Sequence, residues 1–265
     1  MSATKAKGGV RQGEPPRELE GRVCLVTGAG VRVGRAIAEE LGRAGARVAV
    51  HYGQSASGAR ATVRAIQGDG GSERARAFPA ELRAPGAAAA LVKDVRAWGG
   101  RLDVLVCSAA RFQRRPFEEI DGPAWHDMLA VNLEAPFRLA QAAAPELRRR
   151  GGAIINILDV AAFQAWRGYA HYAVSKAGLA MLTRVLALEL APRVRVCGVA
   201  PGMVAPAPGT PKAVLARELG RIPLGRVGSP ADVAQAVRYL CTASYVTGTV
   251  LAVDGGRSAG PRSAP

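Results

Sequence analysis

The sequence is poor in the residues that build metal sites and disulfide frameworks. Its 265 residues include only four cysteines and three histidines. The cysteines form no CxxC pair, and none of the histidines has ligand spacing to a cysteine, so we expect no bound metal. We interpret the cysteines as small buried hydrophobic residues in a reducing cytoplasm: Cys24, Cys107, Cys197 and Cys241.

Long apolar runs are also absent. No stretch of the sequence is long enough to span a bilayer, and the N-terminus has no apolar segment typical of a secretory signal. We therefore expect a cytoplasmic protein without a membrane partner. Residues 1–20 are rich in Gly, Pro, Lys, Arg and Glu, which predicts a disordered leader. A single folded domain is expected at 21–258, followed by a flexible tail at 259–265.

Acidic residues are fewer than basic ones. The chain has 21 Asp and Glu against 36 Lys and Arg, and its formal net charge is +15. Such a field attracts anions, including a phosphorylated cofactor or nucleic acid. The basic residues are scattered apart from Arg148–Arg150, a run typical of a helix C-terminus. We interpret the charge mainly as solvated surface that helps cofactor capture, and we expect no specific nucleic-acid partner.

Short β-rich runs alternate with amphipathic helical patterns from residue 22 to residue 254. Several of the runs are almost wholly apolar, as expected of parallel strands that are covered on both faces. The alternation predicts one α/β domain with a Rossmann-type, doubly wound, parallel seven-stranded sheet and helices on both faces. The predicted strands are 22–27, 46–51, 74–79, 103–107, 153–158, 194–199 and 249–253.

A glycine-bearing turn follows the first predicted strand. Gly28, Gly30 and Gly34 surround the start of the next helix, where small residues let the backbone approach a pyrophosphate. Within a βαβ unit this pattern favours a dinucleotide site over a tight turn without a ligand. The second strand ends in His51-Tyr52-Gly53-Gln54-Ser55 and has no acid to hold a ribose 2′-hydroxyl. Its absence favours NADP(H), with Arg32 either binding the phosphate or lying on the surface.

A tyrosine and a lysine four residues apart predict the chemistry. Tyr172 and Lys176 project from the same face of a helix, and Asp159 lies thirteen positions upstream. The ammonium is expected to lower the pKa of the phenol. A tyrosine poised in this way can supply a proton while a nicotinamide supplies a hydride.

These features together resemble the short-chain dehydrogenase/reductase family over about residues 22–257. The resemblance rests on Thr27–Gly34, Asn132 in Ala-Val-Asn-Leu, Tyr172 with Lys176, Pro201-Gly202 and Val253-Asp254-Gly255-Gly256. It implies that Tyr172 is the proton donor, that Lys176 binds the nicotinamide ribose, and that Asn132 holds a relay water. Cofactor contacts are expected at Gly28, Arg32, Val33, Gly34, His51, Ser55, Glu81, Leu82, Ser108, Ala109, Lys176, Pro201 and Gly202.

Two residues depart from the commonest pattern of that family. Arg32 stands where a third glycine is usual, and Asp159 stands where a serine usually polarises a substrate carbonyl. An anionic carboxylate opposes the alkoxide that forms in carbonyl reduction. In reduction of a C=N bond the nitrogen is protonated instead, and a carboxylate stabilises the cation or passes on the proton. Asp159 therefore favours a C=N acceptor, although it could also simply cap the following segment.

The same departures resemble a subgroup, the pteridine reductases. The similarity extends to His51-Tyr52, Ser55-Ala56, Phe112, Ile155–Asp159 and Gly168-Tyr169. It implies that Phe112 stacks on a pterin, and that Arg32, His51 and Ser55 surround the 2′-phosphate. The chain departs from the subgroup at Gln54, at Ala110 or Arg111, and at Cys107-Ser108-Ala109.

The substrate pocket is expected to include Phe112, Ala110, Trp166 and Met203, covered by the irregular loop at 204–212. A core position is the alternative for Phe112, and packing is the expected role of His171. The first hypothesis is an NADPH-dependent reductase of pterin-like or other C=N substrates. A carbonyl reductase or alcohol dehydrogenase and an NADP-binding regulatory protein are the alternatives. The resemblance also implies a homotetramer, with the last long helices as interfaces.

Overall fold

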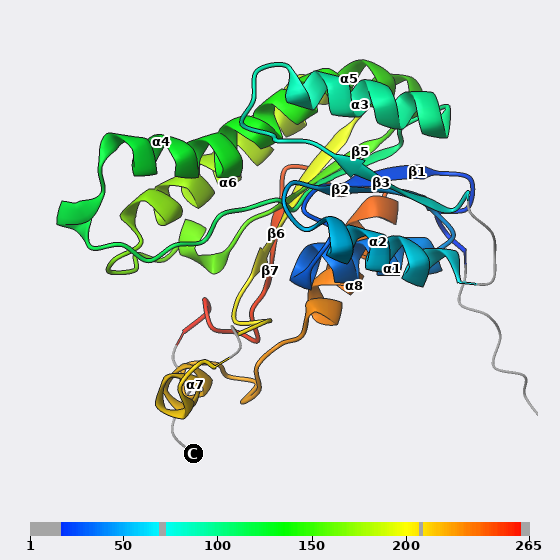
Figure 1. Cartoon of the computed structure of the whole chain (residues 1–265). Coiled ribbons are helices and arrows are strands. Elements are labelled where there is room, and N and C mark those ends of the chain that lie inside the picture. The colour runs from blue at the N-terminus through cyan, green and yellow to red at the C-terminus, as the bar shows by residue number, and fades with distance from the viewer. Residues whose placement is uncertain (1–16, 69–72, 207–208, 261–265) are drawn as a thin grey trace, which may run out of the picture.

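Seven parallel strands form the central sheet of this computed structural model, which describes residues 17–68, 73–206 and 209–260 (Figure 1). Each boundary lies within two residues of its predicted position, and the predicted fold class is confirmed. The strands, in spatial order, are β3 (Ala75–Pro79), β2 (Arg47–Tyr52), β1 (Val23–Val26), β4 (Val104–Cys107), β5 (Ala153–Ile157), β6 (Arg195–Pro201) and β7 (Val250–Val253).

The strand order reverses at β1, which pairs with β2 on one side and β4 on the other. In open parallel sheets a ligand binds beyond the carboxyl ends of the strands at such a switch point. The segments that follow β1, β4, β5 and β6 are therefore the ones expected to build a site.

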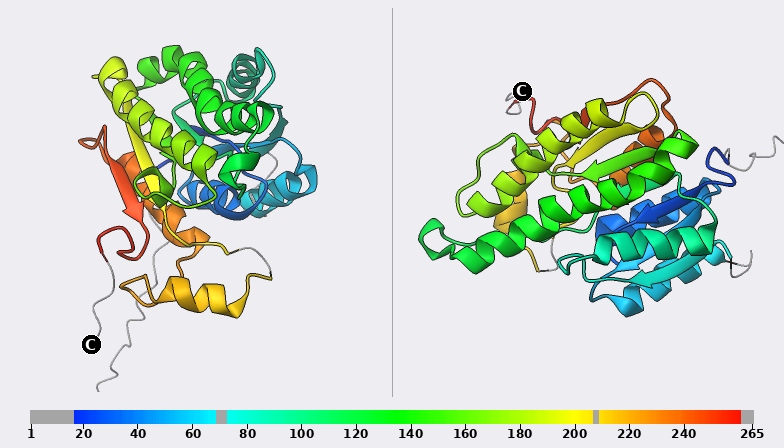
Figure 2. Two further views of the ribbon diagram at one scale, coloured as in Figure 1. Left: turned by 90° about the vertical axis from the view of Figure 1, so that its left-hand side faces the viewer. Right: turned by 90° about the horizontal axis from the view of Figure 1, so that it is seen from above.

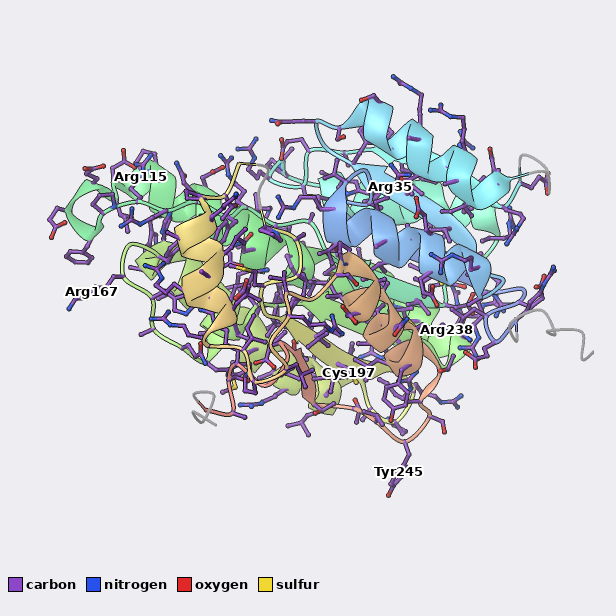
Figure 3. All side chains as sticks on the ribbon, turned by 90° about the horizontal axis from the view of Figure 1, so that it is seen from below. Arg35, Arg115, Arg167, Cys197, Arg238 and Tyr245 are labelled. Carbon is purple, nitrogen blue, oxygen red and sulfur yellow. The ribbon has the colours of Figure 1, made fainter. Side chains whose placement is uncertain are left out.

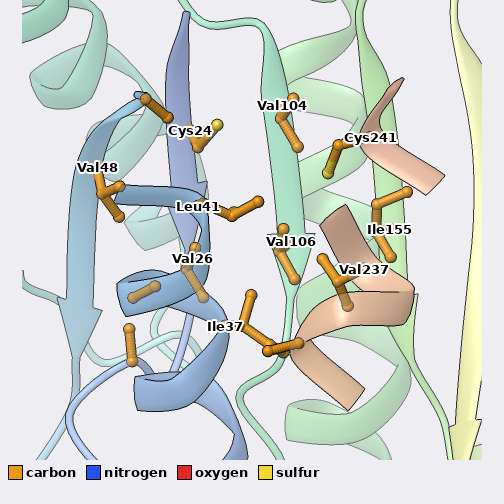
Figure 4. Close-up of a cluster of buried hydrophobic side chains, with 14 of the residues drawn as sticks. Cys24, Val26, Ile37, Leu41, Val48, Val104, Val106, Ile155, Val237 and Cys241 are labelled. Atoms are coloured by element: carbon orange, nitrogen blue, oxygen red, sulfur yellow. The ribbon is translucent and has the colours of Figure 1, made fainter. Parts of the chain in front are cut away.

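Helices cover both faces of the sheet (Figure 2). One face packs against α1 (Arg32–Arg43), α2 (Ala56–Gln67) and α8 (Pro230–Thr242), and the other against α3 (Ala87–Gly99), α5 (Ala135–Arg150) and α6 (Ala170–Leu190). Alternate strand residues divide between the two cores because side chains point to opposite faces of a strand. Thus Cys24 and Val26 join the α1 and α8 side (Figure 4), whereas Val23 and Leu25 join the other.

Two further helices lie near the carboxyl edge of the sheet. The helix α4 (Gly122–Leu129) runs through a π-helical turn (Ala130–Glu134) into α5, while α7 (Lys212–Leu219) follows the loop after β6. That loop is irregular in its described part, as predicted, with residues 207–208 outside the described range. The arginine run predicted to end a helix does form the last turn of α5.

The predicted boundary of the leader needs correction. Leu19 is fully buried in the α1-side core, and its N–H donates to the carbonyl of Ala44 at 2.9 Å. Residues 17–20 therefore belong to the fold, because an apolar side chain there gains more from burial than from solvent. Residues 1–16 of the leader and 261–265 of the tail lie outside the described residues. Within the described part of the chain, no helix combines the length and the hydropathy needed to cross a membrane.

Candidate active site

Tyr172, Lys176 and Asp159 converge beyond the end of β5, as predicted. Tyr172 and Lys176 lie one turn apart near the start of α6 and are almost fully buried. The Tyr172 hydroxyl donates to Asp159 Oδ2 at 2.8 Å. Lys176 Nζ donates to the Ile157 carbonyl at 2.9 Å and lies 5.9 Å from the centre of the Tyr172 ring.

Asp159 uses its two carboxylate oxygens for two tasks. Oδ1 accepts from the Ala161 N–H at 2.8 Å and so caps the short 3-10 helix Val160–Ala162, while Oδ2 faces Tyr172. The capping alternative and the chemical one are therefore compatible. Burial raises the pKa of Asp159, opposed by the Ala161 N–H, by Tyr172 and by the charges of Lys176 and Arg257. A carboxyl group with a raised pKa is better able to hold a proton.

The expected effect on the tyrosine is wrong in direction. Burial, and then the charge and the hydrogen bond of Asp159, raise the pKa of Tyr172. The carboxylate acts directly on the hydroxyl, whereas the ammonium bonds a carbonyl and lies over the ring. Lys176 itself has its pKa lowered by burial to about 8, with Asp159 opposing the change. Tyr172 is thus held as a protonated donor.

Asn132 connects the loop after β4 to the catalytic helix. It is fully buried in the π-helical turn, a distortion that often marks functional sites. Its Nδ2 donates to the Arg111 carbonyl and to Ser175 Oγ, both at 3.0 Å, and its Oδ1 accepts from the Arg111 N–H at 2.8 Å. Ser175 Oγ in turn donates to the Tyr172 carbonyl at 2.7 Å. Sequence reasoning missed Ser175, although it lies between Tyr172 and Lys176. A relay water at Asn132 stays a prediction.

The glycine turn after β1 is built for close approach. Gly28 has a φ of +64°, and a Cβ there would lie 2.8 Å from Ala109 Cα. A Cβ on Gly34 would lie 2.3 Å from the Gly28 carbonyl oxygen. Thr27 Oγ1 accepts from the N–H groups of Ser108 and Ala109 at 2.9 and 3.0 Å, which joins the turn to the end of β4. Thr27 is thus a positioning residue that the site prediction omitted.

His51 has a different role from the one predicted. Its side chain is buried, and Nδ1 accepts from the Gly28 N–H at 3.1 Å. Nε2 therefore carries the hydrogen and donates to the Ala80 carbonyl, also at 3.1 Å. Both ring nitrogens are used within the protein, so His51 holds the glycine turn instead of facing a phosphate. Burial accordingly lowers the pKa of His51.

Arg32 lies at the start of α1 with its side chain exposed. Its φ of +50° is the only positive value among the described residues other than glycine. This conformation favours glycine, which explains why an arginine is unusual here. The guanidinium donates to the Ala205 carbonyl in the loop after β6.

The remaining predicted cofactor residues follow the carboxyl ends of the strands. Ser55 directly precedes α2 at its N-cap position, and its carbonyl oxygen lies 3.0 Å from the position of a Cβ on Gly30. Glu81 is exposed beyond β3 and pairs with Arg83 at 2.8 Å, which lowers the pKa of Glu81 to about 2.

Gly202, the predicted cofactor residue after β6, donates its N–H to the Val253 carbonyl at 3.0 Å. Val33 and Leu82 pack into the two cores, and Pro201 ends β6. Their contacts with a cofactor stay predictions.

Phe112 is not a core residue, because 60% of its surface is exposed. Its ring stacks on Tyr169 with centroids 5.1 Å apart and meets Tyr172 edge-on at 4.8 Å. It thus lies directly beside the ring of Tyr172, and the neighbouring Ala110 is also exposed. His171 is fully buried, and its ring nitrogens have no hydrogen-bond partner among the described residues, which agrees with packing.

Trp166 and Met203 line two different cavities. Trp166 lines a cavity of about 370 Å³. Met203 lines another, of about 500 Å³, beside β7 and α8. Among the described residues, no three His, Cys, Asp or Glu side chains are placed to hold a metal ion.

A doubly wound sheet, a glycine turn at its switch point and a Tyr–Lys–Asp group at its carboxyl edge define a dinucleotide-dependent oxidoreductase. The family model described as enoyl-(acyl carrier protein) reductase matches residues 28–258. The chain belongs to the short-chain dehydrogenase/reductase family and is an oxidoreductase that uses a nicotinamide cofactor.

Named relatives and solved structures cover nearly the whole chain. A 3β-hydroxysteroid dehydrogenase of Eggerthella lenta is 37% identical over 254 residues, covering 92% of this chain and 96% of the relative. A 3-oxoacyl-[acyl-carrier-protein] reductase of Aquifex aeolicus is 36% identical over 248 residues, covering 90% and 98%. The crystal structure of a dehydrogenase/reductase from Sinorhizobium meliloti has a TM-score of 0.86 at 36% identity, covering 91% of this chain and 96% of that one.

Proposed function

We propose that this chain is an NADP(H)-dependent reductase of a pterin-like substrate, such as a dihydropteridine or dihydrofolate, or of a related C=N bond. The observation that carries the proposal is the 2.8 Å hydrogen bond from Tyr172 to Asp159. Reduction of C=N increases positive charge on nitrogen as it is protonated, and a neighbouring carboxylate stabilises that charge. Reduction of a carbonyl would instead place an alkoxide beside the same carboxylate.

The protein groups suit the handling of a proton. Tyr172 stays protonated because its pKa is raised, and its proton already points at Asp159. Asp159, whose own pKa is raised, can take up a proton and pass it to the substrate. Lys176 supplies the positive charge that keeps this buried carboxyl group from being isolated.

The turn after β1 fits a dinucleotide. Close approach of Gly28 and Gly34 leaves no room for side chains, and the residue before α1, Val31, offers no side-chain cap to its N–H groups. Those N–H groups can therefore hold a pyrophosphate. When bound, the cofactor would supply the hydride. Arg32 and Ser55 are the proposed phosphate ligands, and the choice of NADP(H) rests on them and on the lack of an acid after β2.

Phe112 would provide a face for a flat heterocycle. Its ring is exposed, lies beside the ring of Tyr172, and is stacked on Tyr169. Offset stacking of aromatic rings contributes about 0.5–1.5 kcal/mol beyond simple burial. A planar substrate held there would present its double bond to the Tyr172 and Asp159 pair.

The main alternative is a carbonyl reductase or alcohol dehydrogenase, which the names of the hydroxysteroid and oxoacyl relatives favour. The test is NADPH oxidation with dihydrobiopterin or dihydrofolate, compared with a panel of ketones. We expect turnover of the pterins, and Asp159→Ser should shift the preference toward ketones by about tenfold or more. Brisk ketone reduction without pterin turnover would reject the proposal.

We also propose that the chain acts as a homotetramer in the cytoplasm. Apolar side chains are exposed along the neighbouring helices α5 and α6: Phe137, Met181, Val185 and Leu188. A row of exposed apolar residues is typical of a surface that binds a second copy. Light scattering coupled to size exclusion measures the mass directly, and a monomer at micromolar concentration would contradict this assembly.

A further inference from the structure

A cavity of about 370 Å³ lies where three distant segments meet near the catalytic group. Trp166 comes from the segment before α6, Arg221 follows α7, and Arg257 follows β7. The complete lining is Gln164, Ala165, Trp166, Arg221, Arg257 and Gly260. Two of these six residues carry guanidinium groups, and one carries a large aromatic ring.

Arg257 is held between Trp166 and Glu218, and its ion pair with Glu218 leaves most of its N–H donors without an acceptor among the described residues. Only 11% of its side chain is exposed, and its guanidinium lies 5.2 Å from the centre of the Trp166 ring. One nitrogen lies 2.8 Å from Glu218 Oε2, yet that oxygen has no aligned hydrogen bond among the described residues. Nor does the Arg257 guanidinium hydrogen-bond to any other described residue. A buried guanidinium with five N–H donors normally has acceptors for them.

The charges around the cavity do not balance. Glu218 is the acid that pairs with the group, and it is shared among Arg257, Arg221 at 3.4 Å and Arg217 at 3.6 Å. Asp159 is the second acid within range of the charge of Arg257, so three guanidinium groups face two carboxyl groups. Arg257, which is largely shielded from water beside the Trp166 ring, and the more exposed Arg221 together make a good environment for a carboxylate or a phosphate.

The cavity is connected to the catalytic group through a short series of rings. Trp166 meets Tyr169 edge-on at 5.9 Å, and Tyr169 meets Tyr172 at 6.3 Å. Arg257 is also close enough to oppose, through its charge, the rise in the pKa of Asp159. A molecule of moderate length could therefore occupy the cavity with one end and reach Tyr172 with the other.

We infer that this cavity binds an anionic group, a carboxylate or a phosphate, at the end of the substrate remote from the bond that is reduced. The inference rests on the proposed reductase function and narrows its substrate class. The substrate would be an elongated molecule with a reducible double bond at one end and a negative charge at the other. Arg257 and Arg221 would bind the charge, and Trp166 would contact the adjoining apolar part.

Binding of small probes tests this inference without any turnover. Benzoate, phenyl phosphate and neutral benzamide are titrated into the full-length protein, and quenching of tryptophan fluorescence is followed. Trp166→Phe identifies the part of the signal that arises in the cavity. We expect at least one anion to bind about tenfold or more tightly than benzamide. The anion can form hydrogen-bonded ion pairs with the arginines, whereas neutral benzamide cannot. The preferred anion identifies the group as carboxylate or phosphate. Equal binding of benzamide would overturn the inference.

Three arginine variants locate the site. Arg257→Met should weaken binding of the preferred anion about tenfold or more and leave benzamide unchanged. Arg221→Gln should weaken binding of the anion by a smaller factor. Because this variant leaves the Arg257–Glu218 pair intact, it still tests the inference if Arg257→Met fails to fold. The matched control is Arg167→Met, which removes an exposed guanidinium next to Trp166 that points away from the fold (Figure 3). Equal loss in Arg167→Met and Arg221→Gln would overturn the inference, because it would show a general effect of charge.

The outcome is independent of the reductase assay. The probes contain no C=N bond, so anion binding is measured whichever substrate the enzyme reduces. Failure to reduce pterins with intact anion binding rejects the proposed function alone. Pterin reduction without anion binding rejects only the inference that this cavity binds an anionic group.

Discussion

The two ends of the candidate site differ in how well the sequence predicted the contacts of their side chains. The catalytic end comprises Asp159, Tyr172 and Lys176, and the nucleotide end comprises the glycine turn after β1 with its neighbours Arg32 and His51. At the catalytic end, Asp159, Tyr172 and Lys176 meet as their spacing predicts, within one strand–loop–helix unit. At the nucleotide end the glycine turn forms, but two predicted phosphate ligands have protein partners: His51 binds the Gly28 N–H, and Arg32 binds the Ala205 carbonyl. Helical spacing defines contacts within a unit, whereas His51 at the end of β2 and Arg32 at the start of α1 contact partners that the fold brings near from other segments.

The strongest test of the catalytic end is Tyr172→Phe. Loss of the proton donor should lower kcat by about 10²–10⁴-fold. NADPH affinity, which depends on the nucleotide end, should change little. Steady-state kinetics and fluorescence titration measure the two quantities, with Tyr239→Phe on the exposed face of α8 as the control. Retention of full activity would instead favour a regulatory, non-catalytic role.

Lys176→Met tests whether the buried charge of Lys176 raises or lowers the unfolding free energy of the protein. The folded pKa of Lys176 is about 8 against an ordinary 10.5. Between these two pH values the unfolded chain binds more protons than the folded chain, so the unfolding free energy of the wild type increases as the pH rises. The variant lacks this term. It should be more stable than the wild type at pH 7, by about 1–3 kcal/mol, and lose that advantage by pH 10.

Urea unfolding at both pH values measures this difference. Comparison between variant and wild type cancels the contribution of Cys24, whose pKa is raised by burial and does not depend on Lys176. The contribution of Cys107 does not cancel, because the charge of Lys176 opposes the rise that burial causes in the pKa of Cys107. Lys93→Met, on the exposed side of α3, is the matched control and should show no pH-dependent difference. A variant that is less stable at pH 7 would mean that the Ile157 hydrogen bond outweighs the cost of burying the charge.

The smallest effect is expected at the nucleotide end, from Arg32→Gly. Glycine adopts a φ of +50° without the cost that a side chain incurs there, so the unfolding free energy should rise by up to about 1 kcal/mol. The same change removes the proposed phosphate ligand and should reduce the preference for NADPH over NADH. Thermal unfolding and the two dissociation constants are the measurements. An unchanged preference would place Arg32 only as a partner of the Ala205 loop.

Much of the core could be predicted from the sequence. Short, almost wholly apolar runs located the strands closely, and the division of Val23 and Leu25 from Cys24 and Val26 follows from the two-residue period of a strand. Leu19 was not predicted, since a single leucine in a polar segment carries no periodicity. The exposed position of Phe112 could not be read either, because a lone aromatic residue after a strand is compatible with core and surface.

The amino-acid sequence by itself determined the parallel sheet, the glycine turn and the meeting of Asp159 with Tyr172 and Lys176. These features arise from strand and helix periodicity and from short-range connections. Only the tertiary structure decided that burial and the Asp159 carboxylate raise the pKa of Tyr172, that His51 faces inward, and that Trp166, Arg221 and Arg257 line one cavity. Partner choice between distant segments depends on burial and on the direction of each side chain, and neither is encoded in spacing along the chain.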